Sequence, residues 1–197
     1  WMLEDGAEQC SNLRREVDPY ELYRESRLGW KLAPKQLVVL RALYAWRELQ
    51  ARQRNQARNR IVREQALWPM AKQQPDNLVT LARIEDMHPR TVRQDGENLL
   101  QVIKQAAQTP EADWPERLAE PLPAAAAAQL KQLRAIGEAL AEAKDMAPEL
   151  MLRKKYLEQL LKSGNTDRPY QLPQGLRGWR RELMGEALLN ALQGVTA

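Results

Sequence analysis

The chain has 197 residues, and its 30 lysines and arginines against 26 aspartates and glutamates give a net charge of +4. Hydrophobic residues make up 44% and charged residues 28%, which is typical of a folded globular protein and excludes a disordered tail. No apolar run approaches the ~18–20 residues of a membrane-spanning helix. The single cysteine excludes an internal disulfide and a cysteine-rich zinc site. We expect a soluble, cytoplasmic protein with no membrane partner.

Leucine and alanine dominate, phenylalanine is absent, and no stretch alternates between apolar and polar residues. The sequence therefore predicts an all-α fold. Trp1 stands before Met2, and we interpret the chain as a piece of something longer. Residues 1–11 have the pattern of the end of a helix whose partners lie elsewhere. Residues 12–33 form a connector whose aromatic side chains we expect to pack on the helices after it.

Residues 34–108 have the pattern of one compact bundle of five helices. Pro34 is placed to begin a central helix that runs to about residue 55, because proline suits the first turn. A second helix is expected at 62–73, kinked or restarted at Pro69, and a third is capped by Asp76 or Asn77. His88 precedes a fourth helix, and Gly96 separates it from a fifth at 98–108.

Residues 109–123 contain four prolines and form a predicted semi-stiff linker to a second helical domain at 124–197. There, helices are expected from Ala124, from Pro148 and over 179–193. Three short matches suggest that the two domains are repeats. Residues 96–100 recur at 185–189, residues 62–63 at 152–153, and residues 40–43 at 133–136, which are offsets of 89, 90 and 93.

Charge is concentrated between Arg41 and Arg63, where seven arginines face one acid, Glu48. Residues 34–108 carry a net charge of +6, against −2 for 1–33 and zero for 109–197. The planar guanidinium fork matches phosphate oxygens, so phosphate groups are the natural partner. The alternative is a solvated face near a helix end. The candidate nucleic-acid-binding residues are Arg47, Arg52, Arg54, Arg58, Arg60, Arg63, Arg90 and Arg93.

No catalytic residues can be identified in the chain. Asp95 and Glu97 imitate a metal-binding pair, but they sit at a helix junction without two further acids. His88, the only histidine, precedes a proline and is better interpreted as a helix cap. We therefore expect neither a metal site nor another cofactor in these residues.

The sequence resembles the C-terminal part of ribonuclease D, which consists of two HRDC domains. The resemblance lies in residues 28–32 (LGWKL), 40–48 (LRALYAWRE), 58–64 (RNRIVRE), 81–84 (LARI) and 176–183 (LRGWRREL). It departs from the HRDC pattern at residues 85–88 (EDMH), where glycine is more usual in the turn.

The resemblance implies a parent protein that trims RNA 3′ ends, including tRNA precursors, as a 3′→5′ exoribonuclease. Its two metal ions, Mg²⁺ or Mn²⁺, would be held by four acidic residues of a nuclease domain upstream of Trp1. On this interpretation the chain binds and positions RNA beside its own nuclease domain. The alternative is a structural module that packs on the nuclease domain or on a dimer partner and has little affinity for RNA. An autonomous helical enzyme would need a metal site that the sequence lacks.

Overall fold

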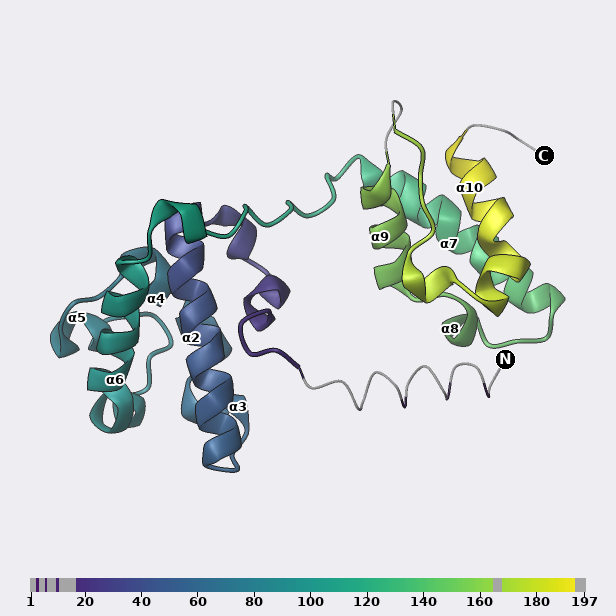
Figure 1. The fold of residues 1–197 in the computed structure, drawn as a ribbon. Coiled ribbons are helices and arrows are strands. Elements are labelled where there is room, and N and C mark those ends of the chain that lie inside the picture. Colours follow the sequence, from purple (N-terminus) through teal and green to yellow (C-terminus); the bar gives the residue numbers. More distant parts are fainter. Residues whose placement is uncertain (1–2, 4–5, 7–9, 11–16, 165–167, 194–197) are drawn as a thin grey trace. The chain divides into compact units, whose positions relative to one another are not determined.

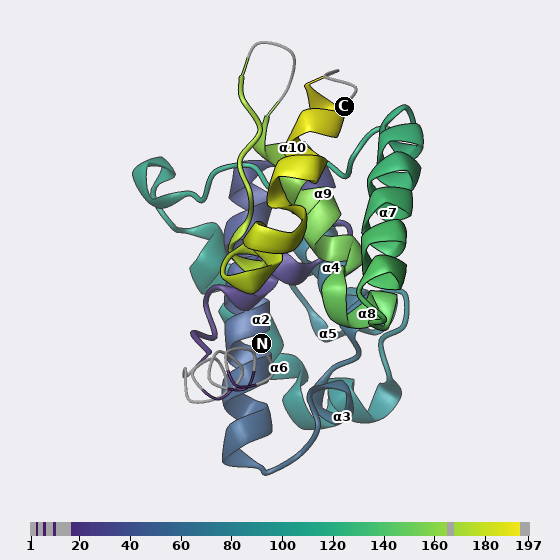
Figure 2. The same cartoon turned by 90° about the vertical axis from the view of Figure 1, so that its right-hand side faces the viewer.

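A computed structural model describes residues 17–164 and 168–193, together with the single residues 3, 6 and 10. All regular elements in these ranges are helical, so the expected all-α class is confirmed. The chain forms two compact units, divided between Glu120 and Pro121 (Figures 1 and 2). None of the described helices is long and apolar enough to cross a membrane. The interpretation of residues 1–11 falls almost wholly outside the described ranges.

Helix α2 (Pro34–Gln53) is the centre of the first unit. Pro34 stands in its first turn as predicted, and Leu37, Leu40 and Leu43 are fully buried. The helix packs against α4 (Glu64–Gln73) and α6 (Pro89–Ala107) around one hydrophobic core. Burial on most sides explains why the sequence of α2 has apolar residues around most of its circumference.

The remaining elements of this unit are α3 (Arg58–Ile61) and α5 (Leu78–Ala82). The sequence did not predict α3. It also placed a helix break at Gly96, which is wrong because α6 continues through this residue. The reason for glycine is close packing, since a Cβ atom here would come within 2.6 Å of Leu78 Cδ2. Gly96 therefore lets α5 approach α6.

Both predicted caps are present. Asn77 accepts a hydrogen bond from the Thr80 backbone N–H at 2.9 Å, and His88 Nδ1 accepts one from the Arg90 N–H at 3.1 Å. Helix α4 continues through Pro69, which lies inside its bounds.

Segments that precede and follow the five helices in the sequence complete the core of the first unit. Before α2 lie the short 3₁₀ helices η1 (Leu22–Glu25) and η2 (Gly29–Lys31), and Tyr23 is only 1% exposed. After α6 lies η3 (Glu111–Asp113), and Trp114 and Leu118 also pack on this core. The first part of the predicted linker is therefore attached to the first unit.

The second unit has its own core between α7 (Ala126–Ala143), α8 (Pro148–Met151), α9 (Lys154–Ser163) and the C-terminal helix. The single helix predicted from Pro148 is interrupted because Leu152 adopts an extended conformation. After η4 (Gln174–Leu176), the last helix starts at Trp179, as predicted, passes through a π-helical turn, η5 (Arg181–Gly185), and continues as α10 (Glu186–Leu192).

The two units are repeats with an offset of 90 residues through their first three helices. The ends of α2 and α7, and both bounds of α3 and α8 and of α4 and α9, differ by 90. Asn55 and Asp145 both adopt positive φ, 48° and 51°, just after the first helix. The duplication is thus confirmed, but the offset of 93 is wrong. Leu133 corresponds to Leu43, not to Leu40.

Candidate nucleic-acid interface

In the structure the eight predicted arginines form two groups, which differ in what their side chains contact. Four of them already bind acidic groups of the first unit, at distances typical of ion pairs or shorter. The others are exposed on α3, on α6 or just before α4. The first group is Arg47, Arg52, Arg54 and Arg58, of which Arg47 alone is buried, and the second group is Arg60, Arg63, Arg90 and Arg93.

Arg47 cannot contact a nucleic acid, because its side chain is inside the protein. It is 2% exposed, stacks over the Tyr44 ring and donates a hydrogen bond to Glu64 Oε2 at 2.6 Å. Tyr44 also donates to Glu64. Partial burial of Glu64 raises its pKa, but these two hydrogen bonds together with the positive charges of Arg47 and Arg58 lower it more, so the net pKa lies below the usual value. Arg47 is therefore a core residue, and its inclusion in the interface was wrong.

Glu48 holds two further arginines, Arg52 and Arg58. Arg52 Nε donates to Glu48 Oε1 at 2.7 Å, and Arg58 binds the other carboxylate oxygen. The hydrogen bond from Arg58 holds the pKa of Glu48 below its usual value, against the opposing effect of burial. Arg52 also donates to the carbonyl oxygen of Val17 at 2.8 Å. These two arginines therefore fasten the connector and α3 to α2.

Arg54 is fixed by Asp95, one of the two acids that imitate a metal-binding pair. Two hydrogen bonds of 3.0 and 2.6 Å join its guanidinium to the carboxylate of Asp95, which is 3% exposed. The hydrogen bond raises the pKa of Arg54. This bidentate pair ties the end of α2 to α6, and Arg54 also lines a cleft.

The cleft lies beside α3 and the N-terminal turn of α6 and has a volume of about 280 Å³. No carboxylate of the described residues lines it. Apart from Arg54, its arginines pair only weakly with neighbours: Arg63 lies 3.8 Å from Asp86, and Arg90 donates to Gln94 at 3.2 Å. The lining residues are Arg54, Gln56, Asn59, Arg60, Arg63, His88, Arg90, Thr91 and Gln94. We call this surface the arginine cleft.

The arginine cleft has the chemistry of an anion site. Guanidinium groups offer forked donors to phosphate oxygens, and Gln56, Asn59 and Gln94 add amide groups. The N-terminal end of the 19-residue helix α6 lies at the cleft, and the positive end of the helix dipole there favours negative charge. Arg93 is exposed on α6 but does not line the cleft.

Sequence reasoning missed the neutral polar lining. Gln94 lies one helical turn after Arg90, so a helical projection of α6 would have found it. Asn59 lies between two predicted arginines, and its side chain also accepts a hydrogen bond from the Glu64 N–H at 3.2 Å. Polar residues of this kind carry no charge signal, which is why a count of charges overlooks them.

No group of three or more histidine, cysteine, aspartate or glutamate residues in the described part of the chain could hold a metal ion. The metal ions that the resemblance implies therefore have no set of ligands among these residues.

Two family descriptions match the chain. Residues 36–103 match the HRDC domain, and residues 127–188 match the C-terminal HRDC domain of ribonuclease D. The first match covers α2 to α6 apart from the ends, including every residue that lines the arginine cleft. The second covers the second unit from α7 to the first turn of α10.

Similar full-length proteins are named ribonuclease D. The one from Pseudomonas paraeruginosa is 62% identical over 98% of this chain and 51% of its own length. The one from Escherichia coli K12 is 32% identical over 90% of this chain and 48% of its own length. A crystal structure of Escherichia coli RNase D, described as an exoribonuclease involved in structured RNA processing, gives a TM-score of 0.83 at 28% identity. It is matched over 99% of this chain and 52% of the solved one. The chain thus spans about half the length of these relatives.

Proposed function

Because this chain belongs to the ribonuclease D family and spans its tandem HRDC region, we propose that its first unit binds the phosphodiester backbone of RNA and positions RNA 3′ ends for a nuclease domain. The observation that supports this function is the arginine cleft, in which Arg54, Arg60, Arg63 and Arg90 surround about 280 Å³ without a lining carboxylate from the described residues. The substrates would be structured RNAs such as tRNA precursors.

In this proposal the arginines have two separate roles. Arg60, Arg63 and Arg90 contact phosphates, while Arg54 is held in place by Asp95 and presents a fixed donor at the edge of the cleft. Contacts to phosphate position a substrate without reading its sequence. Binding should therefore tolerate many sequences and weaken steeply with salt, because counterions are released from the RNA. Divalent metal ions would act in the nuclease domain, not in this cleft.

The test is fluorescence anisotropy of the purified chain with a labelled tRNA-like RNA that has a 3′ extension, measured over a series of salt concentrations. We expect the triple change Arg60→Ala, Arg63→Ala and Arg90→Ala to weaken binding by about tenfold. The slope of log K against log[salt] should fall by about 2–3, because each phosphate that is no longer neutralised removes roughly one unit. All three side chains are exposed, so folding should be retained.

The matched control is Lys35→Ala, Arg83→Ala and Lys104→Ala, which removes the same charge from exposed positions outside the cleft. This variant should keep most of the affinity and most of the salt slope. Equal losses in both triple variants would show that only net charge matters and would contradict the assigned cleft. Absence of RNA binding at low salt would contradict the proposed function and favour a purely structural role.

A further inference from the structure

The internal repeat allows one surface of the second unit to be compared directly with its counterpart in the first. Positions in α7, α8 and α9 correspond to positions 90 residues earlier in α2, α3 and α4, as the helix bounds show. Leu130 therefore corresponds to Leu40, Arg134 to Tyr44, and Leu157 to Leu67. The same correspondence covers the loop before the short helix, where the N–H of Gln56 binds Ala51 O and that of Met146 binds Ala141 O, both at 3.0 Å.

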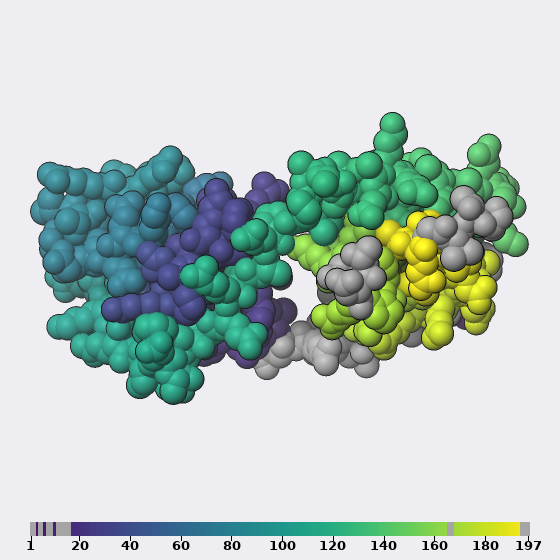
Figure 3. Space-filling model, turned by 90° about the horizontal axis from the view of Figure 1, so that it is seen from above, coloured from purple at the N-terminus to yellow at the C-terminus, as the bar shows by residue number. Residues whose placement is uncertain are grey.

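In the first unit the α2 and α4 part of this surface is covered by residues 17–32 of the connector. The α8 positions Glu149, Leu150 and Arg153 correspond instead to Asn59, Arg60 and Arg63, which line the arginine cleft. The connector runs antiparallel to α2. Its Val17 carbonyl binds Arg52 near the end of the helix, whereas Gly29 lies against Leu40 near the beginning. The Trp68 side chain of α4 fixes it further, since Nε1 donates to the Leu28 carbonyl at 2.9 Å. In Figure 3 the purple connector adjoins the teal residues that come after α6, consistent with the approach of Leu118 to Gly29.

The connector is anchored by two adjacent side chains. Leu22 and Tyr23 of η1 are 4% and 1% exposed and belong to the core of the first unit. Acidic residues surround these anchors: residues 18–25 (DPYELYRE) contain three acids and one arginine, a net charge of −2. The first unit thus binds, within its own chain, a short acidic segment with a leucine–aromatic pair.

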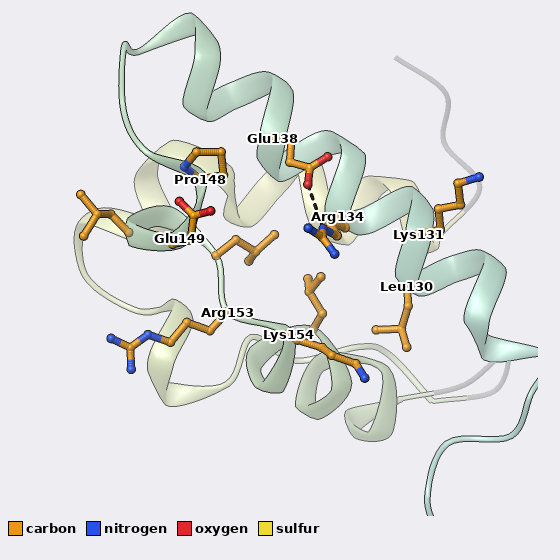
Figure 4. A pocket seen from close by; sticks show the side chains of 11 residues that line it. Leu130, Lys131, Arg134, Glu138, Pro148, Glu149, Arg153 and Lys154 are labelled. Atoms are coloured by element: carbon orange, nitrogen blue, oxygen red, sulfur yellow. Dashed lines mark hydrogen bonds and ion pairs between the residues drawn. The ribbon is translucent and has the colours of Figure 1, made fainter.

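In the second unit the corresponding surface is a groove of about 830 Å³ between α7, α8 and α9 (Figure 4). Leu130, Leu152 and Leu157 form its apolar lining together with Pro148 and Leu150, and Leu150 is 59% exposed. In Figure 4 the ends of Lys131 and Arg153 point outward on opposite sides of the groove. The charged lining residues are Lys131, Arg134, Arg153, Lys154, Glu138 and Glu149, four basic against two acidic.

We propose that this groove binds a short acidic segment of a partner protein that carries adjacent leucine and aromatic side chains, in the position that the connector occupies on the first unit. Three observations support this occupant. The α7 and α9 side of the groove is the surface that the connector covers in the other repeat, the groove lining is apolar as the anchors require, and its basic rim complements the acids around them.

The second unit as a whole has little of the charge that attracts RNA. Residues 124–197 contain 11 basic and 8 acidic residues, a net charge of +3 over 74 residues. The net charge of zero counted for residues 109–197 is lower because that range includes the acidic linker. Within the groove, Arg134 already donates to Glu138 at 2.8 Å, and Lys154 lies 3.4 Å from Glu158. An apolar lining with partly neutralised rim charges suits a protein segment better than a phosphate backbone.

The test uses the complete chain and a dye-labelled peptide with the sequence of residues 18–26 (DPYELYRES) as the probe. Fluorescence anisotropy should show saturable binding. A peptide with both Leu22→Ala and Tyr23→Ala should bind at least about tenfold more weakly, because each anchor buries apolar area. The chain variant Lys131→Glu with Arg134→Glu should weaken binding of the original peptide by about tenfold as well. Leu150→Ser, an uncharged change at an exposed position, should weaken it by a few-fold.

The control variant Lys144→Glu with Arg181→Glu reverses two exposed basic residues of the same unit outside the groove and should change peptide affinity by less than about twofold. Equal weakening by this control, or no binding of the peptide to the unaltered chain, would overturn the proposal. The labelled RNA provides the second readout. If Lys131→Glu with Arg134→Glu lowers RNA affinity as much as peptide affinity, the groove is a nucleic-acid surface and the proposal is wrong. Loss of RNA binding in the arginine-cleft variant would leave the peptide result unchanged.

Discussion

The two units have the same sequence of helices but leave different surfaces open. In the first unit Thr91, a short residue at the start of α6, donates to the Ile61 carbonyl at 3.2 Å, and the arginine cleft remains beside it. At the corresponding position of the second unit stands Arg180, which donates to the Met151 carbonyl at 3.2 Å. Its guanidinium also stacks on Trp179 at 4.2 Å. The larger, buried side chain of Arg180 thus takes the place of the short Thr91 side chain.

The opposite difference is found at the surfaces of α2 and α7. The connector covers the α2 surface of the first unit, whereas the corresponding α7 surface of the second unit forms a groove. The HRDC fold therefore does not by itself determine a binding site. A few side chains, and the presence or absence of a covering segment, decide which surface remains available.

The largest effect that would test this comparison is expected at Arg47, whose counterpart in the second unit is Gly137. Arg47 is buried against Tyr44 and Glu64, while Gly137 makes room for Leu152, whose Cδ2 would lie 2.3 Å from an added Cβ atom. We expect Arg47→Ala to destabilise the first unit by about 2–3 kcal/mol, through reduced packing and a broken ion pair. The measurement is thermal or urea unfolding. Lys35→Ala, an exposed change at the start of α2, is the control, and a loss below about 1 kcal/mol in Arg47→Ala would refute a structural role.

A smaller effect is expected at Glu48, which joins Arg52 and Arg58. Glu48→Gln should lower the free energy of unfolding of the first unit by about 1–2 kcal/mol at pH 7, because charged hydrogen bonds are weakened. The pKa values of Glu48 and Glu64 are lowered in the folded state. Their stabilisation is therefore complete above the unfolded value of about 4.5 and is lost as the pH falls through the lower folded values.

Unfolding measured at several pH values between about 7 and 3 tests this sign. The difference between the original chain and Glu48→Gln should shrink toward the acidic end of the series. A constant difference over the whole range would mean that the charge of Glu48 does not contribute.

The smallest effect is expected at Gly178, at the position that corresponds to Pro89 of the first unit. Gly178 adopts φ of 59°, in the left-handed region, whereas Pro89 begins a regular helix. Gly178→Ala should destabilise the second unit by about 1 kcal/mol, because a Cβ atom disfavours this conformation. Unfolding of this variant is compared with that of Gln174→Ala, a change in the preceding turn. Equal stability of the two variants would show that the backbone at Gly178 is not required.

Local sequence signals predicted local structure well. Pro34, Asn77 and His88 each mark a helix start that the structure confirms, because proline and cap residues act on the backbone of their own turn. Gly96 misled the prediction, because glycine can serve either a helix end or a close contact between helices. Only the position of Leu78 on the neighbouring helix shows that the second reason applies.

By itself, the sequence determined the all-α class, most helix starts, the repeat and the concentration of arginine in the first unit. It could not determine which arginines face solvent. Arg47 is separated from Arg54 by two helical turns, yet it is buried and paired with Glu64, while Arg54 reaches Asp95, 41 residues further along the chain. Charge is a property of each residue, but an ion pair between distant residues depends on how the helices pack. The tertiary structure therefore decided which cations hold the fold together and which remain exposed in the arginine cleft.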